Sequence, residues 1–363
     1  MKNKLKTIFV AIPVFFLGVA SLYLVYYFFP NMTQKTIINK QEKEVTVTDA
    51  GIADAVDKIY DAVVVVENYK KEIKVSSGTG FVYKKSDGKA YILTNNHVVS
   101  GADSVMVTFP TKEKVNVEVI GSDIYYDLAV MTVSEEKAKQ VAKTGSSMNL
   151  RLGDTVFTVG APLANEYSGT VTRGIVSGKD RLVPVSVGNP LLGADYIMRV
   201  IQTDASINSG NSGGPLSNSN GEVVGITSLK LISSGVEGMG FAIPIEDAIH
   251  FASIVEKGGK IIRPTLGISI ADIQSQNIFN PSSSNQYVDE GAEIVEIIEG
   301  YPAADGGLKT GDVIIKMDDN IVSSVASLKY NLYKHNLNET AKIIVNRDGK
   351  EIEFNIKLDK AME

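Results

Sequence analysis

Short apolar runs separated by turn residues dominate the chain between about residues 60 and 230. Runs of this length, bounded by Gly, Asn and Asp, are typical of β-strands, and many in succession favour a barrel or sandwich over βαβ units. They read AVVVVENY, GTGFVYKK, AYILTNN, SVMVTFP, NVEVIGSD, DLAVMTV, TVFTVGAP, IVSGKD, YIMRVIQTD and EVVGITSLKL. We therefore predict a mainly β first domain of the β-barrel type, over residues 51–260.

The pattern changes period after this stretch. Residues 243–260, IPIEDAIHFASIVEKGGK, carry apolar residues at helical spacing and Gly258 as a stop, so we expect a helix that closes the first domain. Residues 264–363 then read as a mixed α/β module. Its predicted strands lie near LGISI, AEIVEII, DVIIKM, KIIVNR and EFNIKL, with short helices near PAADGGL and SLKYNLYKH. The polar stretch QSQNIFNPSSSNQYVDE is typical of a surface loop.

The N-terminus predicts a membrane anchor. Residues 1–6, MKNKLK, precede an uncharged apolar run at 7–29, which is long enough to cross a bilayer at about 20 residues. Lysines at the front favour a cytoplasmic N-terminus and an extracytoplasmic remainder. A cleaved signal peptide is the alternative, with a cleavage site after GVA at 18–20, but LYLVYYFF continues the apolar run. Residues 30–50 are polar and read as a linker.

Composition excludes several classes of function. The net charge of −6, with no sustained basic stripe, argues against a nucleic-acid partner. The chain has no cysteine, so it holds no disulfide framework, thiolate metal site or cysteine nucleophile. No HExxH pattern and no close pair of histidines occur, so we expect neither a metal nor another cofactor.

One serine stands among glycines in INSGNSGGPLS, residues 207–217. Gly210, Gly213 and Gly214 flank Ser212, and glycine permits unusual dihedrals and close approach of the backbone. A hydroxyl is a weak nucleophile until a base takes its proton, and the base needs a third group to hold its tautomer. The segment is therefore a catalytic loop if a base and a carboxylate lie beside it, and otherwise a turn.

Three histidines could supply the base. His250 falls within the predicted closing helix and His335 at the end of a helix in the second module, where we expect surface or packing roles. His97 instead follows the apolar strand AYILT, where a strand meets a loop. His97 is therefore the candidate base.

The best-placed carboxylate is Asp127, directly before the apolar run LAVMTV. A partly buried carboxylate there needs a donor such as an imidazole N–H. Asp123 is more turn-like and Asp103 lies in a predicted loop, so both are weaker candidates.

The order His97, Asp127, Ser212, with GNSGGPL around the serine, resembles the trypsin-like serine proteases. TNNHVV, DLAV and QTDASINSGNSGGPL narrow the resemblance to the HtrA, or Deg, proteases, over about residues 51–363. The resemblance implies two six-stranded β-barrels, with the histidine and aspartate on the first and the serine on the second.

The same resemblance implies the roles of the residues. Ser212 would be the nucleophile, His97 the general base and then acid, and Asp127 the group that orients His97. The backbone N–H groups of Gly210 and Ser212 would form the oxyanion hole. The family also implies homotrimers that act without ATP on unfolded or misfolded exported proteins.

The sequence says less about substrate specificity than about the catalytic residues. No acidic residue stands at Ser206, six positions before Ser212, so we expect small or aliphatic side chains before the scissile bond. By analogy with the family, a second segment would pair with substrate as an added strand. It comprises Ile226, Thr227, Ser228 and Leu229. Residues 181–199 form a long connection that matches the family's sensor loop in place, or a plain excursion.

PTLGIS at 264–269, followed by GAEIVEIIEGYPAADGGLKTGDVIIKMDD, resembles a PDZ domain of the same family. The resemblance implies that this segment presents backbone N–H groups to a peptide C-terminus, which pairs with the strand at 268–270 beside the helix at 327–335. The residues are Thr265, Leu266, Gly267 and Ile268.

Two glycine-bearing segments, GTGF at 78–81 and GVEGMG at 235–240, lack the complete pattern of a nucleotide-binding loop and are interpreted as turns. Two classes of function remain: an endopeptidase of extracytoplasmic protein quality control, and a PDZ adaptor or chaperone on a protease-like scaffold that does not cleave. The complete set of Ser212, His97 and Asp127 favours the endopeptidase.

Overall fold

A computed structural model describes residues 16–21, 23–24, 27–28, 49–160, 169–186, 194–228, 238–273 and 287–362 of the chain. The predicted anchor at 7–29 and linker at 30–50 lie mostly outside these residues, as does most of the predicted loop at 274–290. The described residues between 16 and 28 are helical. Within the part of the chain that the structure describes, no helix is long and apolar enough to span a bilayer.

The first β-barrel is closed by six strands in the order β1-β2-β3-β6-β5-β4. Local sequence sets its hairpins: β2 and β3 join through Asp87-Gly88, both at positive φ, as a two-residue hairpin turn requires. Buried apolar side chains of β1 to β6, most of them valines, fill the barrel. The strands are β1 Val63–Lys70, β2 Ile73–Ser86, β3 Lys89–Thr94, β4 Ser104–Thr108, β5 Lys114–Asp123 and β6 Leu128–Ser134.

The second barrel is also closed by six strands, in the order β10-β11-β12-β9-β8-β7. Its strands are β7 Thr155–Gly160, β8 Thr170–Val185, β9 Tyr196–Thr203, β10 Pro215–Asn218, β11 Val223–Thr227 and β12 Gly240–Pro244. The structure corrects one expectation here. Most of the described part of 181–199 is strand rather than loop, because β8 and β9 continue as a paired ribbon from Arg181↔Val200 to Val185↔Tyr196.

Short helices complete this region: α2 Asp49–Asp57, η2 Tyr60–Ala62, α3 Asn96–Val99, η3 Glu135–Lys137 and α4 Ile245–Val255. The predicted closing helix is thus α4, shorter than the expected 243–260 because residues 243–244 belong to β12 and the helix ends at Val255. Helix α2 was not expected, since its nine residues begin within the segment interpreted as a linker. Ile52 and Ala55 of α2 are buried, which explains why the helix forms.

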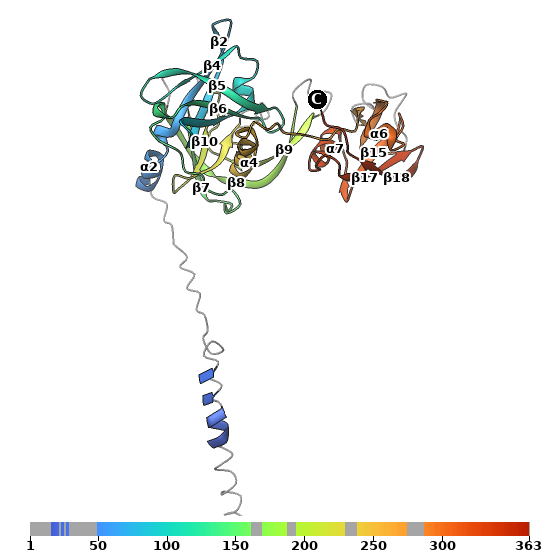
Figure 1. The fold of residues 1–363 in the computed structure, drawn as a ribbon, viewed down its shortest axis with the longest axis horizontal. Helices are drawn as coiled ribbons and strands as arrows, with labels where there is room; N and C mark the ends of the chain where they lie inside the picture. Colours follow the sequence, from blue (N-terminus) through green and yellow to red (C-terminus); the bar gives the residue numbers. More distant parts are fainter. Residues whose placement is uncertain are drawn as a thin grey trace, which may run out of the picture. The chain divides into compact units, whose positions relative to one another are not determined.

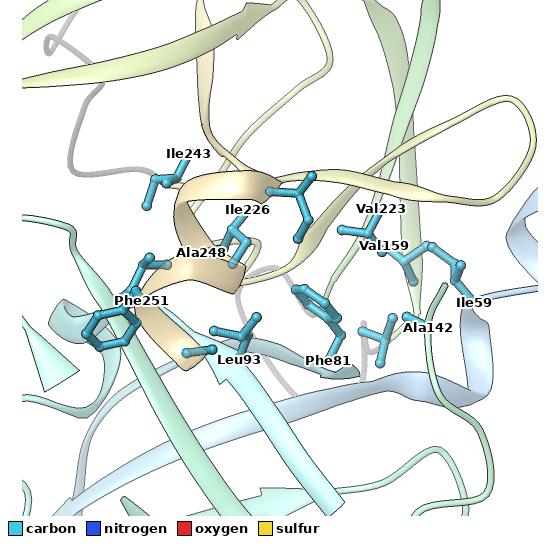
Figure 2. Close-up of a cluster of buried hydrophobic side chains, with 14 of the residues drawn as sticks. Ile59, Phe81, Leu93, Ala142, Val159, Val223, Ile226, Ile243, Ala248 and Phe251 are labelled. Carbon is cyan, nitrogen blue, oxygen red and sulfur yellow. The ribbon is translucent and has the colours of Figure 1, made fainter. Parts of the chain in front are cut away.

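A single buried hydrophobic cluster draws side chains from both barrels and from α4 (Figure 2). Phe81 and Leu93 come from the first barrel, Val159 and Ile226 from the second, and Phe251 from α4. All five are at most 1% exposed. Because the cluster is continuous, the barrels are packed on each other rather than joined only by the chain.

The C-terminal module is a sheet of order β13-β14-β15-β17-β18 with its own buried core. Figure 1 shows β15, β17 and β18 of this sheet together with α6 and α7. Ser324 and Ser327 form a capping box at the start of α7, which fixes where that helix begins. Strand β13 lies at the edge of the sheet. The elements are β13 Ile268–Asp272, β14 Ala292–Ile297, α6 Pro302–Asp305, β15 Val313–Met317, β16 Asn320–Ile321, α7 Val325–Leu332, β17 Thr340–Arg347 and β18 Lys350–Lys357.

Removing a large side chain from the cluster between the barrels tests how much the fold depends on it. Phe81 is fully buried, so Phe81→Ala loses its burial and leaves a cavity. We expect a loss of about 3–5 kcal/mol in the free energy of unfolding, measured by urea denaturation. The control Leu152→Ala removes a side chain that is 68% exposed and should change stability by less than about 0.5 kcal/mol. Equal effects of the two variants would contradict the assigned role of the cluster.

Candidate active site

The three residues singled out from the sequence lie at strand ends of the two barrels. His97 is on α3, the single turn of helix that follows β3. Asp127 directly precedes β6 and has φ of 50°, a left-handed conformation that Asp adopts more readily than most residues. Ser212 lies in the turn that leads into β10 of the second barrel.

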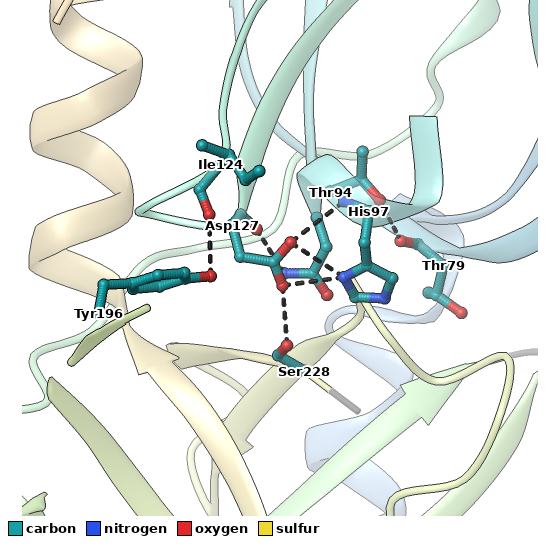
Figure 3. A network of polar contacts seen from close by, with 8 residues as sticks. Thr79, Thr94, His97, Ile124, Asp127, Tyr196 and Ser228 are labelled. Carbon is teal, nitrogen blue, oxygen red and sulfur yellow. Dashed lines mark hydrogen bonds and ion pairs between the residues drawn. The ribbon is translucent and has the colours of Figure 1, made fainter. Parts of the chain in front are cut away.

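His97 and Asp127 contact each other directly (Figure 3). His97 Nδ1 lies 2.9 Å from Asp127 Oδ2 and 3.0 Å from Oδ1. The backbone N–H of His97 also donates to Oδ1, at 3.1 Å. An ionised carboxylate only accepts hydrogen bonds, so Nδ1 carries the hydrogen and Nε2 of the neutral ring is left as an acceptor. The pair therefore selects the tautomer that a general base requires.

Asp127 is completely buried, so its charge needs several donors. Besides His97, the hydroxyl of Ser228 donates to Oδ2 at 2.9 Å (Figure 3). The Asn95 side chain donates to the Asp127 carbonyl at 2.9 Å and holds the backbone at this position. Ser228 comes from the second barrel, so the two barrels meet at this carboxylate.

Tyr196 supports the same turn from β9. Its hydroxyl donates to the carbonyl oxygen of Ile124 at 3.0 Å (Figure 3). Burial, reinforced by the nearby Asp127 charge, raises the pKa of Tyr196, so the phenol stays a neutral donor. The turn before Asp127 is thereby tied to the second barrel at another point.

The Ser212 turn depends on glycine at three positions. Gly210 and Gly213 have φ of 103° and 84°, which other residues rarely adopt. A Cβ on Gly213 would lie 2.2 Å from the Thr79 carbonyl oxygen, and one on Gly214 would lie 2.8 Å from the backbone carbonyl oxygen of Asn211. The N–H of Gly213 donates to the Thr227 carbonyl at 2.8 Å, and Ser212 is 4% exposed. The turn is therefore packed tightly against both barrels.

The weaker candidates have other partners. Asp123 accepts hydrogen bonds from the N–H groups of Tyr125 and Tyr126 and pairs with both terminal nitrogens of Arg263. Asp103 accepts the backbone N–H of Lys71. These two carboxylates therefore shape turns.

The other two histidines also lie in different surroundings from His97. His335 lies between Asp318, at 2.8 Å, and Glu339, at 3.2 Å. His250 is on α4, where its carbonyl accepts the Ser253 hydroxyl.

The residues expected to flank the substrate divide into two groups. Ser206 is exposed, and its carbonyl accepts the Thr172 hydroxyl at 2.9 Å. Ile226 and Thr227 differ from expectation, because neither leaves a free edge for an added strand. Ile226 pairs with both β10 and β12, and Thr227 pairs with β12 and bonds to the backbone of Gly213 and Gly214.

Ser228 departs from its predicted role as well. Its hydroxyl contacts Asp127, and its N–H donates to the Phe241 carbonyl at 3.1 Å. Leu229 lies outside the described residues. The apolar sequence pattern predicted β11 as a strand, but it could not show that neighbouring strands pair with both of its edges.

The predicted peptide-binding segment of the second module lies at the start of β13. Leu266 is 2% exposed and belongs to the core, and its carbonyl accepts the Ala303 N–H at 3.0 Å. Gly267 has φ of 71°, and a Cβ there would meet Tyr301. Thr265 donates its N–H to the Lys360 carbonyl, while Ile268 begins the edge strand. The segment is a tight turn that leads into a sheet edge.

Metal ligands do not gather anywhere in the described ranges: no group of three or more His, Asp or Glu side chains there could hold an ion. The expectation of a site without metal or other cofactor stays a prediction.

Comparison with known proteins matches both parts of the chain. A family model described as "Trypsin-like peptidase domain" matches residues 78–226, and one described as "PDZ domain" matches residues 264–358. The chain is 39% identical over 341 residues to the serine protease Do-like HtrA of Lactococcus lactis subsp. cremoris strain MG1363, covering 85% of this chain and 83% of that protein. It is 42% identical over 290 residues to the serine protease Do-like HtrA of Lactobacillus helveticus, covering 78% of this chain and 68% of that protein.

A solved structure, the serine endoprotease from Yersinia pestis, has the same fold. It superposes with a TM-score of 0.63 at 29% identity and covers 88% of this chain and 100% of that one.

The tight packing of Gly213 can be measured. We expect Gly213→Ala to lower the free energy of unfolding by about 2 kcal/mol or more, because left-handed strain of about 1–2 kcal/mol adds to the contact with Thr79. Gly101 has a similar φ of 69° with no atom within 4 Å of the added Cβ, so Gly101→Ala isolates the strain. Thermal unfolding of both variants makes the comparison. A Gly213→Ala loss no greater than that of Gly101→Ala would show that the contact is not restrictive.

Proposed function

The chain belongs to the HtrA family of serine proteases and is a serine endopeptidase, and we propose that it cleaves unfolded or misfolded exported proteins without ATP through a Ser212 acyl-enzyme. The observation that carries the proposed mechanism is the contact between His97 Nδ1 and the buried carboxylate of Asp127. It leaves Nε2 as the free acceptor of the imidazole, which is the atom that a general base uses.

In the proposed reaction, Ser212 Oγ attacks the scissile carbonyl carbon and its proton passes to His97 Nε2. The tetrahedral intermediate then collapses, the C–N bond breaks, and His97 returns the proton to the leaving amine. Water repeats the sequence on the acyl-enzyme, with His97 again as base. Asp127 stabilises the imidazolium with its negative charge. Three hydrogen bonds hold its carboxylate in place, two from His97 and one from Ser228.

We further propose that the N–H groups of Gly210 and Ser212 form the oxyanion hole. The positive φ of Gly210 supports this, because it is compatible with a sharp turn that presents backbone N–H groups on one side. Each such donor is worth about 10²–10³ in rate when it is aimed at the developing charge.

The decisive experiment compares cleavage of an unfolded protein such as casein by residues 31–363 and by its Ser212→Ala variant. Loss of the nucleophile should lower kcat roughly 10⁴-fold or more. Ser219→Ala is the matched control, since Ser219 lies seven residues further on in the β10–β11 turn, and it should cleave like the unmodified protein. A fluorophosphonate probe should label the unmodified protein and the control only.

Equal cleavage by the unmodified protein and Ser212→Ala would contradict the role of Ser212. Absence of cleavage and of labelling in every variant would instead favour the non-cleaving PDZ adaptor or chaperone.

The preference for small or aliphatic side chains before the scissile bond is also a proposal. Ser206 supports it because it carries no charge, and Ile207 beside it is apolar and 7% exposed, with a side-chain carbon packed against Gly240. A library of peptides that differ only at this position tests it. A preference for Lys or Arg would contradict it.

For the second module we propose that Leu266, Gly267 and Ile268 receive a peptide C-terminus, whereas the N–H of Thr265 already donates to the Lys360 carbonyl. The support is the position of β13 at a sheet edge, where an added strand can pair, together with the left-handed turn at Gly267 before it. An apolar peptide with a free carboxylate should bind at least tenfold more tightly than its C-terminal amide in fluorescence anisotropy. Equal affinities would contradict carboxylate capture.

We also propose that residues 7–29 anchor the protein in the cell membrane, with the catalytic domain on the extracytoplasmic side. The uncharged run after Lys2, Lys4 and Lys6 supports this orientation. Full-length protein should stay in the membrane fraction through carbonate extraction, and release would contradict the anchor.

A homotrimer is proposed from family membership, and light scattering of residues 31–363 tests it. A monomeric mass would contradict it.

A further inference from the structure

The segment GTGF, which opens a predicted strand run but was itself interpreted as a turn, lies inside β2 and contacts the Ser212 turn. Thr79 is fully buried and pairs with Val65 of β1. A Cβ on Gly78 would lie 2.9 Å from the Ser212 carbonyl oxygen, so the glycine lets the strand approach the turn closely. The segment therefore belongs to the surroundings of the active site.

Thr79 donates hydrogen bonds to two backbone carbonyl groups of the turn that carries the nucleophile, those of Gly210 and Ser212. Its N–H donates to the Ser212 carbonyl at 2.8 Å, and its hydroxyl donates to the Gly210 carbonyl at 2.6 Å. A carbonyl oxygen only accepts, so the hydroxyl hydrogen must point to Gly210. The first bond can be made by any residue except proline, whereas the second requires a hydroxyl.

Thr79 is itself held from the histidine side of the site. The Thr94 hydroxyl donates to the Thr79 carbonyl at 2.8 Å (Figure 3), and Thr94 is the last residue of β3, three positions before His97. The same Thr79 carbonyl is the atom that a Cβ on Gly213 would strike. Thr79 thus lies on a rigid strand between the segment that carries the base and the turn that carries the nucleophile.

The bond at Gly210 acts on a residue with unusual freedom. Glycine populates both signs of φ, so the peptide planes on either side of Gly210 can rotate at little cost. Its carbonyl and its N–H belong to neighbouring planes that are joined through Gly210 alone. Fixing the carbonyl by a buried hydroxyl removes one of the rotations by which the N–H could turn away. The N–H of Asn211, which donates to Asn208 at 3.0 Å, fixes the same plane from its other side.

We propose that Thr79 is a positioning residue for the oxyanion hole: its hydroxyl holds the Gly210–Asn211 peptide and thereby restricts the rotations that would turn the Gly210 N–H away from the substrate carbonyl. This rests on the proposed roles of Ser212 and Gly210. Thr79 is below the turn and acts through Gly210, so the hydroxyl matters for the transition state and little for the ground-state complex.

Three variants separate this role from simple packing. Thr79→Val keeps the shape and removes the hydroxyl, and Thr79→Ser keeps the hydroxyl. Thr158→Val is the matched control, because Thr158 is equally buried in β7 and its hydroxyl has no partner among the described residues. Each is assayed with a peptide substrate, with a peptide boronate that forms a tetrahedral adduct on the nucleophile, and with the product peptide.

We expect Thr79→Val to lower kcat about tenfold, between the effect of one ordinary hydrogen bond and that of a lost oxyanion donor, with KM changed less than twofold. The inhibition constant of the boronate should rise by the same factor, while that of the product peptide stays within twofold. Thr79→Ser and Thr158→Val should both stay within twofold of the unmodified protein throughout.

Unchanged kcat in Thr79→Val, or equal weakening of boronate and product, would overturn the proposal. If Thr79→Val does not fold, the same kinetic and inhibition measurements on Thr79→Ala, which lacks the hydroxyl, and on Thr79→Ser, which keeps it, test the proposal. Failure of the peptidase function itself is distinguishable, because the unmodified protein and Ser212→Ala would then behave alike.

Discussion

The hydrophobic cluster between the two barrels is the constraint on which the site depends. Each barrel has buried side chains of its own, but neither carries a complete set of functional groups. His97 and Asp127 are on the first barrel and Ser212 and Ser228 on the second. Phe81, Ile226 and Phe251 exclude water from the surface between them, and burial of such side chains contributes about 1.5–3 kcal/mol each (Figure 2). Packing there positions His97, the proposed base, relative to Ser212, the proposed nucleophile.

Buried polar groups then give this interface its precision. Apolar packing alone is non-directional, whereas the bonds that cross between the barrels have specific lengths and directions. Ser228 reaches Asp127, Tyr196 reaches Ile124, and Thr79 reaches Gly210 and Ser212. A buried carboxylate or carbonyl is costly when unpaired, so each of these bonds resists displacement of one barrel against the other.

Sequence reasoning was most successful where the signal is local. The strand-length apolar runs predicted the strands of a β-barrel, and the helical spacing in residues 243–260 predicted α4. It was least successful where pairing decides the outcome. Residues 181–185 form part of a two-stranded ribbon only because residues 196–200 pair with them. Strand β11 has no free edge because it pairs with both β10 and β12. GTGFVYKK was among the predicted strand runs, but GTGF within it was interpreted as a turn because it lacks the complete pattern of a nucleotide-binding loop. In the structure its first glycine instead permits close approach to the Ser212 turn.

The sequence by itself determined the residue types and their order: a serine among glycines, one histidine and one aspartate at strand ends, and a second module with a glycine turn before a strand. Those features are local and survive without knowledge of distant contacts. Only the tertiary structure decided that Asp127, rather than Asp123 or Asp103, meets His97, that Ser228 supports the carboxylate, and that Thr79 holds the Ser212 turn. Each of these contacts joins residues at least 30 positions apart, so it exists only once the strands have closed into barrels and the barrels have packed together.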